Sequence, residues 1–376
     1  MGTDQEIKEG GVPFYVYGTT DTVIITVFMP LVFAIGVVGN FAVCTVFIRI
    51  KSMRTVTNHY LVNLALADLF FLLFAAPQIW VSYASGIIRH DFSNVGESFC
   101  KVSIFFSDAS ILVSACTIVL VTIERYFAIC MPHRFKTIST RPRAVATCIC
   151  IWIIVGIYKT PALYFSTLIH QDLIWPNNTQ YTEYPKQRET CSYCHSNKPN
   201  STTCERYFKS LAVDNLLVLS VIPIISVLYI LINVQLHKLA NTKMGSSSHR
   251  MKTQVVRMLI VTISVFFICI SPFRIMNLFE TFNQDLIYNK LEVASFMLWA
   301  NIGRVLQYLN SAINPVIYNL MSARYRQAFK DCFLCRVNGQ GMLSEVSGRN
   351  RNKYKVVNTN ASILTKNENG ASTIGE

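Results

Sequence analysis

The sequence predicts an all-α membrane protein: a seven-transmembrane helix bundle followed by a short amphipathic eighth helix. Composition is the first reason, because 52% of the 376 residues are hydrophobic and only 15% are charged, whereas a soluble domain needs more charge on its surface. Seven segments are also long enough to cross a bilayer core, which takes about 20 apolar residues. Finally, basic residues gather in alternate linkers, as they do beside membrane spans.

The seven expected spans are separated by polar linkers. They are residues 22–50, 58–85, 99–130, 143–168, 208–240, 251–282 and 292–321. The chain therefore divides into an extracellular N-terminus (1–21), the seven-transmembrane domain (22–322), an amphipathic helix (323–335) and a cytoplasmic tail (336–376). The tail is rich in Asn, Ser and Thr, and such a composition predicts disorder.

The last span closes with polar residues around a proline. Asn310, Ser311 and Asn314 precede Pro315 within one and a half turns. A proline frees a backbone carbonyl inside a helix, and lipid offers that carbonyl no partner. The stretch therefore predicts a bundle interior, where side chains and water satisfy the freed group.

The net charge of +13 is explained by the side of the membrane on which basic residues lie. The odd-numbered linkers and the segment after the last span carry Arg49, Lys51, Arg54, Arg134, Lys136, Arg141, Arg143, Lys238, Lys243, Arg250, Lys252, Arg324, Arg326, Lys330 and Arg336. The even-numbered linkers mix both signs. The positive-inside rule then places the N-terminus outside and the C-terminus in the cytoplasm of a multi-pass plasma-membrane protein. Membrane lipids, and not nucleic acid, are the expected partners of these charges.

Cysteines on the predicted outside favour disulfides, because that compartment is oxidising. Cys100 opens the third span, and Cys191, Cys194 and Cys204 lie in the fourth linker. We expect Cys100–Cys191, which would pin this linker to a helix lining the bundle, and Cys194–Cys204 as a second pair. Spacing does not settle connectivity, so Cys194 in place of Cys191 stays open. A zinc site at Cys191, Cys194 and His195 is disfavoured outside the cell.

Two further pairs of residues are candidate modification sites. Asn177 and Asn200 begin Asn-Asn-Thr and Asn-Ser-Thr sequences in the fourth linker, on the side where glycosylation occurs. Cys332 and Cys335 follow an amphipathic stretch on the predicted inside and are palmitoylation candidates. Free cytosolic thiols are the alternative for these two cysteines.

Asp68 lies in the middle of the second span, and an ionisable group at that depth is functional by default. With Ser114, Asn310, Ser311 and Asn314 it is expected to form a hydrated polar cluster. Such an oxygen-rich pocket suits a small hard cation such as sodium. A protonated or solvated structural aspartate is the alternative, and no other cofactor is expected.

Each span, or the segment next to it, carries a short motif. They read Gly39-Asn40, Leu64-Ala65-x-Ala67-Asp68, Glu124-Arg125-Tyr126, Trp152, Pro223, Cys269-x-x-Pro272, Asn314-Pro315-x-x-Tyr318 and Tyr325-Arg326-x-x-Phe329. From the first span to Cys335 this pattern resembles the rhodopsin-like (class A) G-protein-coupled receptors. The resemblance implies a receptor and transducer, not an enzyme, with an extracellular ligand, a heterotrimeric G protein, arrestin and a receptor kinase as partners.

The resemblance also assigns a G-protein switch. Its members are Glu124, Arg125, Tyr126, Asn314, Pro315 and Tyr318. The adjacent charges of Glu124 and Arg125 neutralise each other near the interface, and a conformational change can release them. Lys252, at the start of the sixth span, offers Arg125 no acid. We therefore expect Glu124 alone to restrain Arg125.

Within the class, the stretches 122–130 and 309–322 are most similar to thyrotropin-releasing-hormone receptors and invertebrate neuropeptide receptors. Growth-hormone-secretagogue and neuromedin receptors are close behind. This resemblance implies a neuropeptide receptor that signals through Gq and calcium. A receptor for a non-peptide small ligand, or for a ghrelin- or neuromedin-like peptide, is the alternative. A transporter is remote, because no internal repeat is present.

Two arginines predict how a peptide is held. Arg274 and Arg304 fall on spans that should face the cavity from outside, and a guanidinium offers a donor fork to carbonyls or a carboxylate. Asp108 is expected to pair with one arginine or to meet a basic ligand group. The predicted ligand-binding set is Gln78, Asp108, Phe273, Arg274, Asn277, Arg304, Gln307 and Tyr308. An opsin would need a lysine at Tyr308, and an amine receptor an aspartate at Ser107.

Two positions depart from the family pattern. Ile270 stands where a tryptophan is usual in the sixth span, so Phe266, one turn deeper, is expected to carry the rearrangement. Leu231 stands where a tyrosine is usual in the fifth span. Tyr229 is two residues earlier, about 200° round the helix, and would need a local bulge to replace it.

Overall fold

The structure, a computed structural model, describes residues 3–193, 202–241, 246–282 and 293–333. The chain forms two units, Met1–Ala328 and Phe329–Glu376. The first unit contains the helix bundle. The described part of the second unit is the last turn of helix α12 (Ala323–Phe333), where the rings of Phe329 and Phe333 lie 6.1 Å apart.

Seven long helical stretches follow one another in the described chain. The first consists of α2 (Thr19–Val23), the π-helical turn η2 (Ile24–Phe28) and α3 (Met29–Arg49); the others are α4 (Val56–Ala84), α5 (Glu97–Cys130), α7 (Arg141–Phe165), α8 (Thr202–Asn241), α9 (Ser246–Phe282) and α11 (Val293–Met321). The short helices η3 (Lys51–Met53) and α6 (Pro132–Ile138) connect α3 to α4 and α5 to α7. These stretches lie over the seven predicted spans, and the predicted fold class is confirmed.

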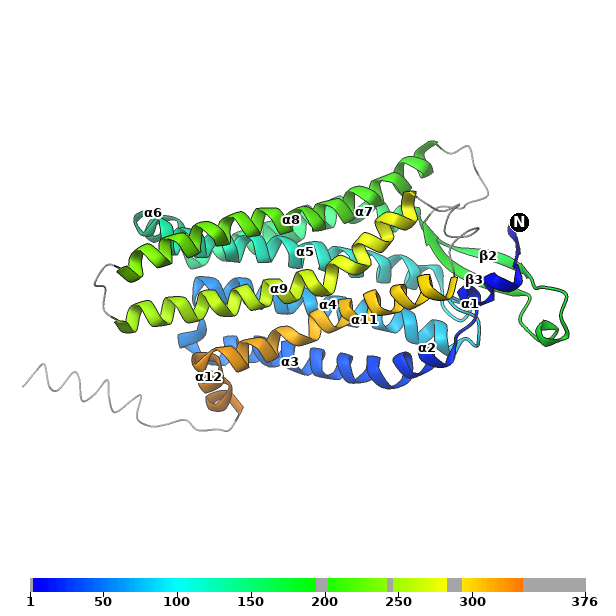
Figure 1. The fold of residues 1–376 in the computed structure, drawn as a ribbon, viewed down its shortest axis with the longest axis horizontal. Coiled ribbons are helices and arrows are strands. Elements are labelled where there is room, and N and C mark those ends of the chain that lie inside the picture. The colour runs from blue at the N-terminus through cyan, green and yellow to red at the C-terminus, as the bar shows by residue number, and fades with distance from the viewer. Residues whose placement is uncertain (1–2, 194–201, 242–245, 283–292, 334–376) are drawn as a thin grey trace, which may run out of the picture. The chain divides into compact units, whose positions relative to one another are not determined.

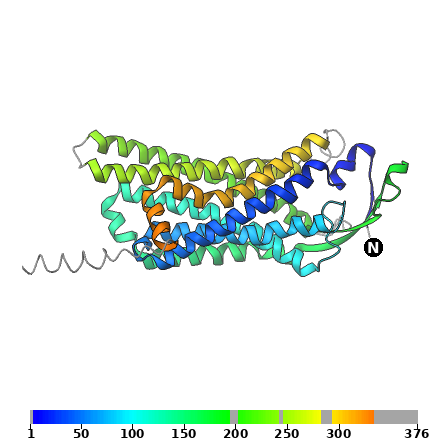
Figure 2. The same cartoon turned by 90° about the horizontal axis from the view of Figure 1, so that it is seen from below.

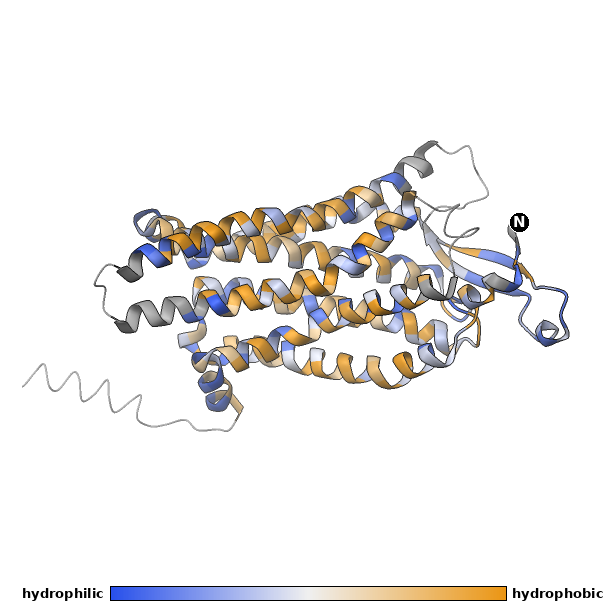
Figure 3. Ribbon diagram, viewed as in Figure 1, coloured by the Kyte–Doolittle hydropathy of each residue, from blue (hydrophilic) through white to orange (hydrophobic). Residues whose placement is uncertain are grey.

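Helix α5 lies at the centre of the bundle (Figures 1 and 2). It packs against α4, α7, α8 and α9, while α11 packs against α9, α3 and α4. Side chains that face away from these contacts are apolar: Ile157 in α7, for example, is 70% exposed. Figure 3 shows hydrophobic residues along the middle of the helices. Exposing such an apolar outer surface to water would be unfavourable, whereas contact with lipid is favourable.

Six described helices are long and apolar enough to span a membrane by length and composition. Helix α11 is equally long, with 29 residues, but polar side chains line its buried side. Asn301, Gln307, Asn310, Ser311 and Asn314 are all buried there. The seventh span is therefore amphipathic because its inner face is part of a polar interior.

A small sheet lies at one end of the bundle, which we call the sheet end; the opposite end, which carries α6, is the α6 end (Figure 1). Strand β1 (Thr3–Glu6) pairs in parallel with β2 (Ser166–Ile174), and β2 pairs antiparallel with β3 (Gln187–Tyr193). Ile7, Ile88 and Leu173 form a separate apolar cluster beneath it. The short elements η1 (Glu9–Gly11), α1 (Val12–Tyr15) and η4 (Thr179–Tyr181) flank the strands.

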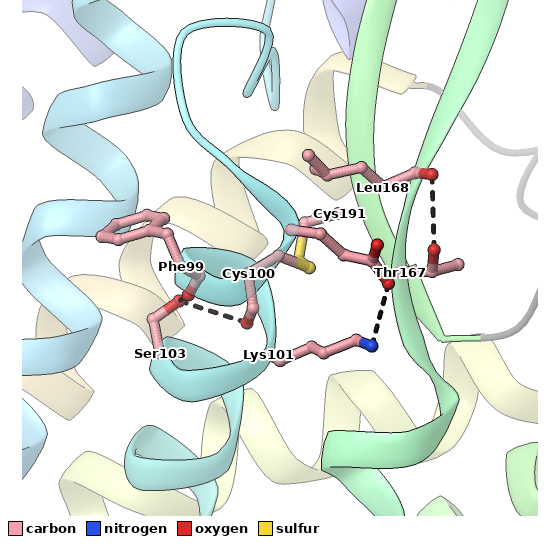
Figure 4. Close-up of a disulfide and its surroundings, with 8 residues drawn as sticks. Phe99, Cys100, Lys101, Ser103, Thr167, Leu168 and Cys191 are labelled. Carbon is pink, nitrogen blue, oxygen red and sulfur yellow. Dashed lines mark hydrogen bonds and ion pairs between the residues drawn. A yellow bond between two sulfur atoms is a disulfide. The ribbon is translucent and has the colours of Figure 1, made fainter.

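A disulfide joins this sheet to the bundle (Figure 4). It links Cys100, in the first turn of α5, to Cys191 in β3, with a Cα–Cα distance of 5.7 Å. The predicted Cys100–Cys191 pair is confirmed, and Cys191 pairs opposite Leu168 of β2. Cys194 lies outside the described residues, as does the side chain of Cys204, so a second pair stays a prediction.

Candidate functional site

A cavity of about 240 Å³ opens at the sheet end, between α4, α5, α9 and α11. The structure brings all eight residues of the predicted ligand-binding set onto its wall: Gln78, Asp108, Phe273, Arg274, Asn277, Arg304, Gln307 and Tyr308. A neighbouring cavity of about 270 Å³ shares Phe273, Asn277 and Arg304 with it. The sequence had placed these residues on four different spans, and the bundle makes them neighbours.

The two predicted arginines line this cavity, and neither forms an ion pair with a carboxylate of the described residues. Arg274 is only 7% exposed; its Nη1 donates to Oδ1 of Asn215 in α8 at 3.3 Å, and its Nε has no partner among the described residues. Within the same residues no carboxylate pairs with Arg274 or Arg304. A buried N–H group without an acceptor, such as Nε of Arg274, costs free energy. This wall is therefore suited to carbonyl or carboxylate oxygens of a ligand.

An acidic cluster adjoins the cavity at Asp108. Lys159 of α7 is buried, and its Nζ lies 2.7 Å from a carboxylate oxygen of Asp214 and 3.8 Å from one of Asp108. Tyr158 donates its hydroxyl to Asp214 at 2.6 Å. The ion pair found for Asp108 is thus with a lysine, and not with one of the predicted arginines. Lys159 and Asp214 were missed because each looks like an isolated charge near a span end.

The N-terminal segment forms part of the cavity wall, which sequence analysis did not predict. Asp21 is buried; it pairs with Arg89, accepts a hydrogen bond from Asn301 Nδ2 at 2.7 Å and accepts another from the backbone N–H of Gly18 at 2.9 Å. The hydroxyl of Tyr17 lies 2.8 Å from that of Ser82. These contacts fasten the chain before the first span to α4 and α11.

Packing against the cavities shifts the pKa values of two residues in the linker between α4 and α5, Arg89 and His90. Burial lowers the pKa of Arg89, and the carboxylate of Asp21 opposes that shift. His90 is exposed at the surface and also lies on the walls of both cavities. Desolvation there, and then the charges of Arg304, Arg188 and Arg89, lower the pKa of His90. His90 is therefore neutral at pH 7, and the positive charge of this wall comes from arginine.

The predicted sodium ligands are together in the middle of the bundle. Asp68 is 1% exposed and accepts a hydrogen bond from Asn314 Nδ2 at 2.8 Å. Asn310, Ser311 and Ser114 are buried and line a small void in the bundle interior. The Oδ1 atom of Asn310 has no partner among the described residues. A buried carboxylate and the unpartnered amide oxygen of Asn310 are the kind of ligands that a hard cation prefers.

The proline in α11 is compensated as the sequence predicted. Pro315 frees the carbonyl of Ser311, four residues earlier, and Asn40 Nδ2 donates to that carbonyl at 2.7 Å. The helices are close here: a Cβ on Gly39 would lie 3.0 Å from the Pro315 ring. In α3, Gly39 therefore allows the close approach to Pro315, and Asn40 supplies the hydrogen bond to the freed carbonyl.

At the α6 end, Arg125 is held by two residues, not one. Its Nε donates to Oε2 of Glu124 at 2.6 Å, and its guanidinium also donates to the hydroxyl of Thr57. That hydroxyl lies 3.2 Å from Glu124 Oε2. The expectation that Glu124 alone restrains Arg125 is therefore wrong, because α4 packs closely enough on α5 to add Thr57. The side chain of Lys252 lies outside the described residues.

The remaining predicted switch residues lie nearby. Tyr318 is 1% exposed, and its ring centroid is 5.6 Å from that of Tyr325. Tyr325 donates its hydroxyl to Asn58 at 3.0 Å, which ties the start of α12 to α4. Tyr126 contacts Phe127, with ring centroids 5.8 Å apart. The switch residues thus come from α5 and α11, and α4 supplies the partners of Arg125 and Asn314.

The expectation for Tyr229 is wrong. Helix α8 is continuous, and Tyr229 is 8% exposed on its inner face whereas Leu231 is 44% exposed. Ile225 and Ile232 are buried at helical spacing from Tyr229, and this apolar row sets which face turns inward. No bulge is needed. Phe266, the residue expected to replace the missing tryptophan, is also buried.

The predicted modification sites are only partly described. Asn177 is exposed at the tip between β2 and β3, whereas Asn200 lies outside the described residues. Cys332 lies in α12 with a buried side chain, and Cys335 lies outside the described residues. Glycosylation and palmitoylation stay predictions.

Known proteins match this sequence over most of its length. A family model described as 7 transmembrane receptor (rhodopsin family) matches residues 39–318. Neuromedin-U receptor 2 of Rattus norvegicus is 32% identical over 82% of this chain and 74% of its own. The allatostatin-A receptor of Bombyx mori is 29% identical over 83% and 80%, and growth hormone secretagogue receptor type 1 of Sus scrofa 29% over 79% and 76%.

Proposed function

The chain belongs to the rhodopsin family of seven-transmembrane G-protein-coupled receptors, and we propose that within this family it is a receptor for an extracellular peptide. Membership makes it a multi-pass plasma-membrane protein and not an enzyme. One observation carries the peptide proposal: two arginines without a carboxylate partner in the described residues line the sheet-end cavity. A peptide chain supplies many carbonyls, and its end supplies an amide or a carboxylate.

The relatives support the same proposal. They are named as receptors for neuromedin U, allatostatin A and growth hormone secretagogues. Among peptide classes we favour a short amidated neuropeptide of the thyrotropin-releasing-hormone type, on the motifs around Arg125 and Pro315. The acidic cluster of Asp108 and Asp214 suits a basic group in the same ligand.

Signal transfer follows from differential affinity for two states. In this structure Glu124 and Thr57 hold Arg125 at the α6 end. A ligand that favours the other state would release Arg125 to a heterotrimeric G protein. We propose that the receptor couples to Gq and raises intracellular calcium, by analogy with receptors that carry similar motifs. We also propose that arrestin and a receptor kinase bind the tail at a later step.

The same proposal fixes the orientation and the remaining sites. The sheet end is extracellular, because it carries the disulfide and the Asn177 acceptor, and the α6 end with its basic residues is cytoplasmic. Cys332 and Cys335 are palmitoylated near that side. The Asp68 cluster holds sodium, for which the unpartnered Oδ1 of Asn310 is a further ligand. These assignments are independent of the identity of the peptide.

A panel of short amidated peptides tests the proposal. Cells expressing the chain at the surface are challenged while intracellular calcium is recorded, and membranes from the same cells are assayed for guanine-nucleotide exchange. We expect a peptide that raises both signals and whose affinity falls when guanine nucleotide is added. Activation by a non-peptide ligand alone, with no response to peptides, would contradict the peptide assignment and leave the family intact.

A further inference from the structure

A further cavity lies at the α6 end, apart from the peptide cavity and the Asp68 cluster; Glu124 is the switch residue on its wall. Its volume is about 450 Å³, and it is bounded by α4, α5, α6 and α7. Ala146, Cys150 and Ile138 on its rim are exposed, the last by 46%. The cavity therefore opens onto the outer surface of the bundle, which faces lipid in a membrane.

Its walls are apolar. Leu120, Ile123 and Phe127 of α5 face Phe135 of α6 and Ala146 of α7 across the cavity. Ligand pockets are typically about 300–1,000 Å³, so the volume suffices for a chain of carbon atoms. Water is poorly stabilised in such a cavity, because apolar walls offer it too few hydrogen-bond partners. An acyl chain, which is abundant beside the opening, can fill it.

Polar and basic residues also line the cavity, between α6 and α7 and at the start of α7. The Oγ atom of Ser139 is buried there and has no partner among the described residues. Arg143 lines the cavity at the start of α7; the described hydrogen bonds of its guanidinium come from Nη1 alone, to the carbonyls of Thr137 and Ile138. Its other N–H groups are available to an acceptor on a bound molecule.

Charge around this opening favours an anion. Arg134, Lys136 and Arg141 are exposed on α6 and at the start of α7, beside Arg143. The acid on the cavity wall is Glu124, whose carboxylate Arg125 already neutralises. Basic residues next to a membrane attract anionic lipid by roughly 1 kcal/mol each. A zwitterionic lipid gains no net attraction from them, and a sterol hydroxyl would use Ser139 but not the arginines.

We propose that this cavity binds one acyl chain of an anionic phospholipid from the adjacent leaflet. The chain lies against Leu120, Ile123 and Phe127, and the headgroup phosphate accepts hydrogen bonds from Ser139 and Arg143. The site is separate from the peptide cavity, and it does not depend on which ligand that cavity takes.

Photolabelling tests the site directly. The full chain is purified into phosphatidylcholine nanodiscs that contain a few per cent of phosphatidylserine with a diazirine in one acyl chain, and the labelled peptides are identified by mass spectrometry. Ala146→Phe narrows the cavity from its exposed rim. Ile153→Phe is the matched control, since Ile153 is 55% exposed on the same helix and does not line the cavity. We expect label on residues 120–150 that Ala146→Phe removes and Ile153→Phe leaves.

Arg143→Gln leaves the apolar residues of the wall unchanged and tests the binding of the headgroup. Loss of one cation should lower this labelling roughly fivefold, the equivalent of about 1 kcal/mol, and a phosphatidylcholine probe should label weakly. Equal labelling by both probes, or labelling that neither Ala146→Phe nor Arg143→Gln reduces, would overturn the proposal. Complete competition by cholesterol would also overturn it, because the occupant would then be a sterol. Thermal unfolding in detergent checks that each variant is folded.

Discussion

The two ends of the bundle treat their arginines differently. At the α6 end Arg125 is held by the carboxylate of Glu124 and the hydroxyl of Thr57. At the sheet end Arg274 and Arg304 line a cavity, and no carboxylate of the described residues pairs with them. Unpaired charge in a partly enclosed site costs free energy. Under the proposed function a ligand would complete the sheet end, whereas at the α6 end Arg125 already has its partners and would lose them only in a conformational change.

The largest effect is expected where the sheet end does have a complete ion pair. Arg89→Ala would leave the carboxylate of Asp21 buried with only Asn301 and a backbone N–H beside it. Breaking a buried pair in this way costs about 3–5 kcal/mol. Thermal unfolding of the purified chain should show a large loss of stability. Lys186→Ala removes an exposed cation at the same end and should change little; equal losses in both would refute the pairing argument.

The second prediction concerns Arg125 at the α6 end. Thr57→Val keeps the shape of the side chain but removes one of the two groups that hold Arg125. Loss of such a hydrogen bond costs about 1 kcal/mol, so the population of the released state should rise roughly fivefold. Ligand-free nucleotide exchange measures it. Thr45→Val, whose hydroxyl bonds only its own helix at Phe41, should leave the basal rate unchanged, and no rise in Thr57→Val would count against this restraint.

Between the two ends, Asp68 is expected to couple ion binding to ligand affinity. Its carboxylate is buried and accepts from Asn314. Asp68→Asn keeps the size and removes the charge that a sodium ion would need. Agonist affinity of the parent should fall by a few fold when sodium replaces a larger organic cation, as linkage requires, and the variant should not respond. The same sodium sensitivity in both chains would exclude Asp68 as the ligand.

The smallest effect is expected from pH. The pKa of His90 is lowered in the folded chain, so below its ordinary pKa of about 6.5 the unfolded chain binds a proton that the folded chain does not. Stability should therefore fall slightly as the pH drops from 7 to 5.5, because His90 is exposed and solvent screens most of the effect of its charge. Unfolding curves of His90→Gln should show a shallower dependence. Identical slopes would mean that the cavity walls do not shield His90 from solvent.

Much of the fold was predictable because the bilayer restricts it. Apolar length gave the seven spans, and the polar residues around Pro315 predicted an interior partner, which is Asn40. The pairing of Cys100 with Cys191 followed from pinning a linker to a helix. The β1–β2–β3 sheet was missed, because short strands outside the membrane have no length constraint and β1 pairs with residues far along the chain.

In the candidate site, too, the residues that the membrane constrains were predictable, and those that only packing brings together were not. Arg274 and Arg304 were predictable, since each stands on an apolar span and must have a reason to be there. Lys159, Asp214 and the Asp21–Arg89 pair were not, because only packing of separate helices makes them neighbours. Tyr229 was misplaced by counting residues from Pro223, whereas the buried row of α8 decides which face turns inward.

The contrast between the two ends is tested most directly by the potency of an activating peptide on Arg304→Ala, matched for surface expression. A charged hydrogen bond is worth about 1.5–3 kcal/mol, so potency in the calcium response should fall roughly tenfold to a hundredfold. Stability without ligand should be unchanged, because Arg304 has no carboxylate partner in the described chain to abandon. Undiminished potency with reduced stability would contradict this contrast, since Arg304 would then serve the fold and not the ligand.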